Sequence, residues 1–167
     1  MYKLWYSGVV RGKNEVGILV DRDLRESVVE VRRVNDRLMF IKLVIGECTL
    51  NVVSAYVPQA GLDEEVKRRF WEDLDEIVRS IPPTERLFIG GDFNGHIGSV
   101  AGSYGEREKY LVTFQSSAVK TQIDYLILRR CDRGLCKDCK VIPGETLATQ
   151  HRLLVMDIGI TMKRRKR

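Results

Sequence analysis

The chain has 167 residues, of which 44% are hydrophobic and 31% charged, the balance of an ordinary folded protein with a single core. No apolar run approaches the ~20 residues of a membrane-spanning helix, and the first residues lack the apolar segment of a secretory signal, so we expect an intracellular protein with no membrane partner. The net charge of +5 is partly an effect of the C-terminal basic run, so composition alone does not demand a nucleic-acid partner.

That basic run, residues 163–167, is treated as a tail on a domain that spans residues 1–162. Runs of lysine and arginine contact phosphate backbones or act as nuclear addresses, and others are simply solvated chain ends. Both interpretations of the tail stay open on the sequence, with the nucleus as a candidate location.

The first third of the chain is rich in short β-branched runs. They lie at residues 16–20, 27–34, 38–45 and 50–57, with polar or turn-forming residues between them. This pattern predicts three or four consecutive strands in an antiparallel meander. The run at 50–57 shows no clean alternation of apolar and polar residues, so we expect both of its faces to be covered.

A change of period follows, because apolar residues recur every three or four positions from Leu62 to Ile81. This spacing predicts an amphipathic helix whose apolar stripe covers a sheet. Acidic residues in its first turn suit the helix dipole, and Pro82-Pro83 ends it.

Strand patterns then return at residues 87–89, 111–114, 123–128 and 153–160. Strands, one helix and strands again, without strict alternation, favour an α/β layered sandwich over a doubly wound parallel sheet.

The segment Gly90-Gly91-Asp92-Phe93-Asn94 carries the strongest local signal, because polar residues follow directly on a buried strand. Gly, Asp and Asn favour tight turns for purely local reasons, so an Asx-type turn is one interpretation. The other is a site, since Asp92 and Asn94 would project to the same side of an extended chain. An acid and an amide placed together can hold and activate a water beside a phosphate.

Other polar residues also lie at strand ends, namely Tyr56 and His151, and Asp124 lies inside an apolar run. A carboxylate buried at Asp124 is costly without a partner. A histidine is the natural partner because a carboxylate fixes the tautomer of the ring, and we therefore expect Asp124 to contact His151.

The four cysteines are Cys48, Cys131, Cys136 and Cys139. The last three could form a metal site with His151 as a fourth ligand, since Cys136 and Cys139 have the spacing of a zinc hook. The alternative is a set of reduced thiols in a loop of an intracellular protein.

Four ordered motifs resemble the endonuclease/exonuclease/phosphatase (DNase I-like) family, which includes the endonuclease domains of non-long-terminal-repeat retrotransposons. They are Ala55-Tyr56-Val57-Pro58, Gly90-Gly91-Asp92-Phe93-Asn94, Gln122-Ile123-Asp124-Tyr125, and His151 before an apolar strand. The resemblance implies a four-layered α/β sandwich of mostly antiparallel or mixed sheets. It also implies hydrolysis of phosphodiesters, most naturally in DNA, with Mg²⁺ or Mn²⁺.

The resemblance implies a role for each of five residues. Asp92 would orient or deprotonate the attacking water, and Asn94 would hold the phosphate. His151, oriented by Asp124, would stabilise negative charge on the phosphate oxygens. Tyr56 would bind a phosphate oxygen or assist the leaving group.

The chain also departs from the family pattern. The glutamate that chiefly holds the metal in the family would lie upstream of Met1, and Glu15 does not replace it. Gln150 stands where an acid usually precedes the last histidine, and a segment is missing near Gly105. An amide is a poorer ligand for a hard cation. We therefore expect an incomplete fold, a weak or lost metal site, and an impaired retroelement-derived endonuclease. The alternative is a non-catalytic remnant that binds nucleic acid or protein.

Overall fold

The fold is known from a computed structural model, which describes residues 2–7, 16–94, 113–115, 117, 120–148 and 150–160. The basic tail, Glu15 and the expected deletion near Gly105 lie outside the described residues, as do residues 111 and 112 of one expected strand. The division into a domain and a tail therefore stays a prediction.

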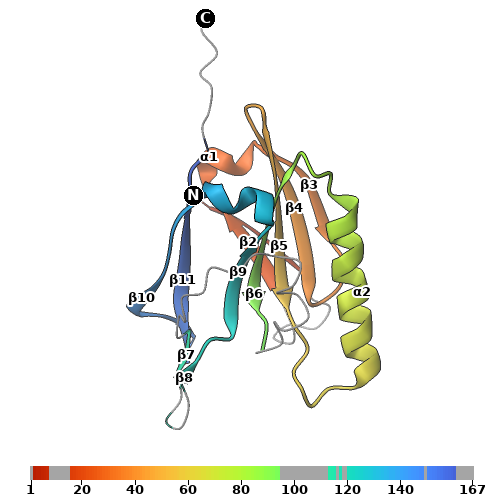
Figure 1. Cartoon of the computed structure of the whole chain (residues 1–167), viewed down its shortest axis with the longest axis vertical. Coiled ribbons are helices and arrows are strands. Elements are labelled where there is room, and N and C mark those ends of the chain that lie inside the picture. Colours follow the sequence, from red (N-terminus) through yellow and green to blue (C-terminus); the bar gives the residue numbers. More distant parts are fainter. Residues whose placement is uncertain are drawn as a thin grey trace, which may run out of the picture.

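A five-stranded sheet forms the centre of the molecule (Figure 1). Its strands, in spatial order, are β3 (Val28–Arg33), β4 (Leu38–Ile45), β5 (Cys48–Tyr56), β6 (Arg86–Asp92) and β9 (Asp124–Leu128). β5 and β6 run parallel, and the other neighbours are antiparallel. The predicted meander is therefore present in β3, β4 and β5.

Helix α2 (Glu64–Ser80) covers one face of this sheet. Its N-cap, Asp63, accepts a hydrogen bond from the Glu65 N–H at 2.7 Å, which satisfies a backbone donor that the helix leaves free. Phe70, Leu74 and Ile77 pack onto the sheet in one buried cluster. The helix predicted from Leu62 to Ile81 is confirmed with slightly shorter ends.

The end of α2 is fastened by Arg129, which follows β9. Its guanidinium donates to the backbone carbonyls of Val78 and Ile81 at 3.1 and 2.8 Å, and to that of Pro82 at 2.9 Å. Val78 lies in the last turn of α2, Ile81 is its C-cap residue and Pro82 follows, so one cation both caps the end of α2 and ties it to the sheet.

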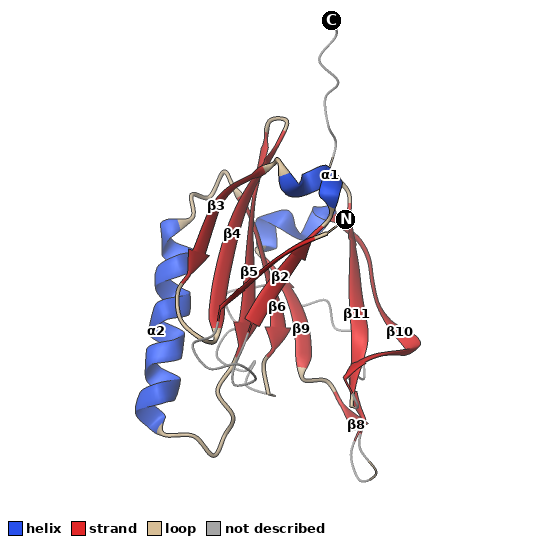
Figure 2. Ribbon diagram, turned by 180° about the vertical axis from the view of Figure 1, so that it is seen from behind, coloured by secondary structure: helices blue, strands red, loops and turns tan. Residues whose placement is uncertain are grey.

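Two smaller sheets face the other side of the five-stranded sheet (Figure 2). One pairs β1 (Lys3–Ser7) with β2 (Val16–Val20). The other contains, in spatial order, β10 (Cys136–Ala148), β11 (His151–Ile158), β7 (Phe114–Gln115) and β8 (Lys120–Thr121). The strand expected at 16–20 is therefore present, but it pairs with β1 outside the meander.

Both faces of the central sheet are buried. Val53 and Ala55 of β5 pack toward α2, whereas Leu50 and Val52 pack toward the small sheets. The prediction that residues 50–57 are covered on both faces is thus confirmed. The described residues form three layers, a helix, a sheet and a pair of sheets. The mixed α/β sandwich is confirmed, but the fourth layer that the resemblance implied is not present among these residues.

The short helices α1 (Arg22–Arg25) and η2 (Arg130–Leu135) connect strands. Cys131 lies in η2, while Cys136 and Cys139 lie on β10, so the expectation of a cysteine loop was wrong. A strand forms here because β10 pairs with β11, and Cys136 packs inward against the central sheet.

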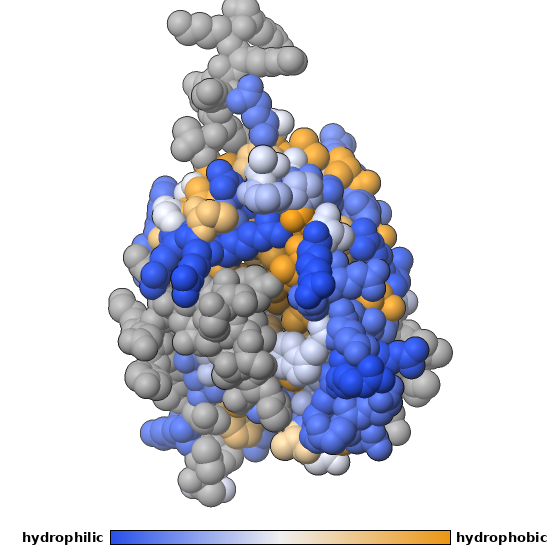
Figure 3. All heavy atoms as spheres, turned by 45° about the vertical axis from the view of Figure 1, so that its right-hand side comes forward, coloured by the Kyte–Doolittle hydropathy of each residue, from blue (hydrophilic) through white to orange (hydrophobic). Residues whose placement is uncertain are grey.

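The solvent-facing side of α2 is strongly charged, and Figure 3 shows the hydrophilic surface of this region. No helix in the described part of the chain combines the length and apolar character needed to cross a bilayer.

Candidate active site

Three polar residues form a row across neighbouring strands at one rim of the central sheet. Tyr56 at the end of β5 is in register with Asp92 at the end of β6, and Asp92 is in register with Asp124 at the start of β9. Residues in register across a sheet project to the same face. Phe88 and Leu128, an even number of residues from Asp92 and Asp124, pack toward the small sheets, so the row faces those sheets.

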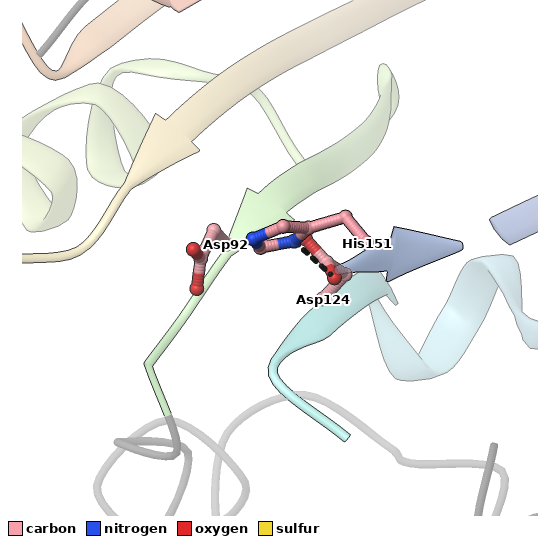
Figure 4. A group of neighbouring side chains, drawn as sticks. All are labelled: Asp92, Asp124 and His151. Carbon is pink, nitrogen blue, oxygen red and sulfur yellow. Dashed lines mark hydrogen bonds and ion pairs between the residues drawn. The ribbon is translucent and has the colours of Figure 1, made fainter. Parts of the chain in front are cut away.

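His151 meets this row from the opposite layer, because it is the first residue of β11. Its Nδ1 lies 3.1 Å from Oδ2 of Asp124. One ligand atom from each of Asp92, Asp124 and His151 lies within 4.8 Å of the other two. Figure 4 shows the imidazole between the two carboxylates. The expected contact of Asp124 with a histidine is therefore present.

A histidine that donates from Nδ1 to a carboxylate keeps Nε2 free for a second partner. In Figure 4 the second ring nitrogen lies on the side of Asp92. The ring of His151 also packs edge-on against Phe114, with ring centroids 5.6 Å apart. The imidazole is thus held in place by one hydrogen bond and one aromatic contact.

Gly91 allows β6 to place Asp92 at the rim. Its φ of 154° lies in a region that favours glycine, and a Cβ there would overlap the carbonyl of Ala55. Beyond Gly91, the Asp92 carbonyl accepts from the Val57 N–H at 2.8 Å. The glycine therefore permits a close approach of β5 and β6 at the point where both strands end.

Asn94 departs from expectation. The residue has a φ of 47°, in the left-handed region, so the chain is not extended and the two side chains do not simply project together. The Asn94 N–H donates to Oδ1 of Asp92 at 2.9 Å, and its Nδ2 donates to the carbonyl of Val57 at 2.6 Å. The Asx-type turn and the candidate site are therefore both present in one segment.

Thr113 is a positioning residue that the sequence did not indicate. It is completely buried, and its Oγ1 accepts from the backbone N–H groups of Ile123 and Asp124 at 3.1 and 3.0 Å. Its carbonyl accepts from the Arg152 N–H at 2.7 Å. Thr113 thus links the start of β9 to the start of β11, where the two members of the histidine–carboxylate pair lie. No periodicity signals such a long-range contact.

The electrostatics of Asp92 are unusual. Burial raises the pKa of its carboxyl group, and the negative charge of Asp124 raises it further. The Asn94 N–H and the charge of His151 act in the opposite direction without cancelling the effect of burial. A carboxylate with a raised pKa is a stronger base than an exposed one, which suits proton abstraction from water.

Replacing Asp92 with asparagine should make the protein more stable at neutral pH. With a raised pKa, Asp92 binds a proton more tightly in the folded protein than in the unfolded chain. Stability is therefore lost as pH rises from the ordinary aspartate pKa through the folded value, and Asp92→Asn removes that loss. Urea unfolding over a pH series should show the two proteins converging in acid. The exposed Asp157, changed to asparagine, is the control. An Asp92→Asn protein that is less stable at neutral pH would contradict this account.

The donor set suits a hard divalent cation. The candidate ligands are a carboxylate oxygen of Asp92 and the oxygen of Asp124 that is not bonded to His151. Hard cations prefer such oxygens to imidazole. Among the residues that the structure describes, Asp92, Asp124 and His151 form the one group able to supply three ligands. The cysteines therefore do not gather into a metal site with His151, and none of the four forms a disulfide.

Gln150 lies in an exposed turn directly before His151. Its carbonyl accepts from the Gln115 N–H at 3.1 Å, so its backbone supports the end of β7. No carboxylate precedes the histidine here.

No family model matches the chain. The chain is similar in sequence to craniofacial development protein 2 of Bos taurus, with 24% identity over 186 residues, covering 90% of this chain and 31% of the relative. The same protein of Tragulus javanicus is 23% identical, with 90% and 32% covered. The chain therefore spans about a third of the length of these curated relatives.

Solved structures show a shared fold at low identity. The endonuclease domain of TRAS1, a telomere-specific non-LTR retrotransposon, superposes with a TM-score of 0.73 at 15% identity, covering 95% of this chain and 80% of that domain. An endonuclease/exonuclease/phosphatase family protein from Leptotrichia buccalis gives 0.64 at 13% identity, with 96% and 72% covered. The 3′ phosphatase NExo from Neisseria, bound to a product DNA hairpin, gives 0.64 at 16%, with 95% and 80% covered.

Proposed function

The chain has the DNase I-like fold of the endonuclease/exonuclease/phosphatase family, and from this premise we propose that it is a divalent-metal-dependent phosphodiester hydrolase of the DNA endonuclease type. The observation that carries the proposal is the meeting of Asp92, Asp124 and His151 at one rim. These residues come from three strands in two layers, yet they converge on one point. A base beside a charge-stabilising donor is what hydrolysis of a phosphodiester requires.

Asp92 is the group that orients or deprotonates the attacking water. Its raised pKa brings its basicity closer to the working pH, which favours proton transfer. Because its Oδ1 already accepts from the Asn94 N–H, the carboxylate has a fixed orientation. The second oxygen is then the one available to a water.

His151 is the donor to the phosphate. Asp124 holds Nδ1, so Nε2 is the nitrogen that can donate to an oxygen on which negative charge develops. Thr113 fixes Asp124 through its backbone N–H, and so fixes the ring indirectly. The pair supplies an oriented N–H donor on one side of the reacting phosphorus.

Tyr56 and Asn94 complete the proposed phosphate site. Tyr56 of β5 is in register with Asp92 of β6, so the two backbones are one strand spacing (~4.8 Å) apart. The Tyr56 hydroxyl is a donor for a phosphate oxygen. One N–H of the Asn94 amide is bonded to Val57, which leaves the other for the phosphate.

A bound Mg²⁺ or Mn²⁺ would be held by the carboxylates of Asp92 and Asp124 and would supply Lewis-acid polarisation of a phosphoryl oxygen. The site offers few protein ligands for the metal, since the residue before His151 is the amide Gln150 and not an acid. We therefore propose weak metal binding and impaired turnover.

DNA is the proposed partner. The NExo structure contains product DNA, and a D. rerio TDP2 structure, which is 13% identical to this chain with a TM-score of 0.63, is complexed with a single-strand DNA product. We also propose an intracellular location, because none of the four cysteines forms a disulfide, with the basic tail as a candidate nuclear address.

A second candidate is a non-catalytic remnant that binds nucleic acid or protein through the same scaffold. Gln150 favours it, because an exposed amide replaces a charged ligand directly before His151. Retroelement descent fits both candidates, given the likeness in fold to the TRAS1 domain.

The two candidates are separated by metal-dependent nicking of supercoiled plasmid. We expect the purified chain to nick the plasmid with Mg²⁺ or Mn²⁺, and to stop when EDTA removes the metal. Metal-independent nicking would contradict the proposed hydrolase. Binding of the plasmid without nicking, measured by gel shift, would instead support the second candidate.

A further inference from the structure

A fourth residue extends the row at the rim. The carbonyl of Arg37, just before β4, accepts from the Tyr56 N–H at 2.9 Å, so Arg37 lies opposite Tyr56 as the next member after Asp124, Asp92 and Tyr56. Met39, two residues on, packs toward the small sheets. By the alternation of a strand, Arg37 projects to the same face as the site.

The side chain of Arg37 is in an unusual state. The residue is only 8% exposed, and its Nη1 is buried with no hydrogen-bond partner. Nη1 is one of two such side-chain atoms among the described residues. Arginine stays charged in a protein, and an unpaired buried guanidinium N–H carries a desolvation cost. The folded protein can bear this desolvation cost where another contact holds the guanidinium in place.

That contact is with Tyr56. The guanidinium carbon of Arg37 lies 5.0 Å from the centroid of the Tyr56 ring, within the range of a cation–π interaction. The charge is therefore held on an aromatic face and is not neutralised by a carboxylate in the described part of the molecule.

We infer that Arg37 is a positioning residue, which holds the Tyr56 ring against the rim and makes its hydroxyl a stronger donor to an anionic phosphate oxygen. A cation on the ring face withdraws electron density from the phenol, which strengthens its O–H as a donor. The stack also orders the ring before the ligand arrives, so less freedom is lost on binding. The inference depends on the proposed function only for the identity of the ligand.

A double-mutant cycle tests whether Arg37 acts through Tyr56. The probe is a short fluorescein-labelled single-stranded DNA, with EDTA present to prevent turnover, and affinity is measured by anisotropy. Arg37→Met should weaken binding roughly 2- to 30-fold, the range of a cation–π contact, and Arg37→Lys should restore part of it. In a Tyr56→Phe background, the same Arg37→Met change should have little effect. A purely structural or long-range charge effect would be equal in both backgrounds and would overturn the inference.

Arg33→Met is the matched control, because it removes the same charge from an exposed arginine whose Nε donates to the Tyr6 carbonyl. It should leave the affinity nearly unchanged.

A second measurement needs no ligand. In protein with ¹³C-labelled tyrosine rings, the Tyr56 signals are identified by their loss in Tyr56→Phe. They should shift in Arg37→Met and stay in place in Arg33→Met. Unshifted signals in Arg37→Met would overturn the inference. If the wild type binds no DNA while the Tyr56 signals do shift, the proposed function fails and the role of Arg37 in holding the ring is retained.

Discussion

Replacing Asp92 with alanine should lower the rate of metal-dependent phosphodiester hydrolysis about 10²–10⁴-fold, the usual contribution of a general base. Asp92 has a pKa raised by burial, lies in the group with Asp124 and His151, and is held by the Asn94 N–H. The change removes a candidate base and a candidate metal ligand together. The measurement is initial nicking rate of supercoiled plasmid at saturating Mn²⁺.

Asp157→Ala is the matched control, because Asp157 is an exposed aspartate on β11, the strand that carries His151. It should nick at the wild-type rate. Thermal unfolding of both variants shows whether either has lost its fold. Nicking by a folded Asp92→Ala protein at the wild-type rate would rule out Asp92 as the base.

Replacing Asp132 with alanine should cost about 1–3 kcal/mol of folding free energy, as expected when the hydrogen bonds of a buried charged group are lost. Asp132 is completely buried in η2. Its Oδ1 accepts from Arg86 Nη1 at 2.7 Å, and its Oδ2 accepts from the Leu87 N–H at 3.3 Å. Both donors would lose their acceptor, and Arg86 lies at the start of the strand that delivers Asp92.

Urea unfolding measures this loss, with Asp138→Ala as the control. Asp138 lies 3.6 Å from Lys140 in an exposed pair, which is worth roughly 0–1 kcal/mol. We expect the control to unfold close to the wild-type midpoint. If Asp132→Ala were no less stable than Asp138→Ala, the contacts of Asp132 with Arg86 and Leu87 would not hold η2 against the sheet.

Several elements were predictable because their signals are local. The stripe from Leu62 to Ile81 marks α2, since the period of a helix is written in the residues of the helix itself. The β-branched runs of β4 and β5 are likewise local, and the lack of alternation in β5 correctly indicated two buried faces. The apolar surroundings of Asp124 were enough to predict a histidine partner.

Other features depend on residues far apart in the chain. The sequence could not show that β2 pairs with β1, because a strand pattern does not name its neighbour. Asn94 was expected in an extended chain, but its amide turns back to Val57, a residue 37 positions away. Cys136 was expected in a loop, and burial against the central sheet makes it part of a strand.

The sequence by itself determined which residues are candidates for the chemistry, since Tyr56, Asp92 and His151 stand at the edges of apolar runs, where strands end or begin. Only the tertiary structure decided how they meet, and which residues support them. Strand register sets Asp92 beside Asp124, packing of two sheets brings in His151, and the supporting contacts of Thr113 and Arg37 exist only between distant segments. The physical reason is that side-chain type and period are properties of a segment, whereas register, burial and hydrogen-bond partners are properties of the packed chain.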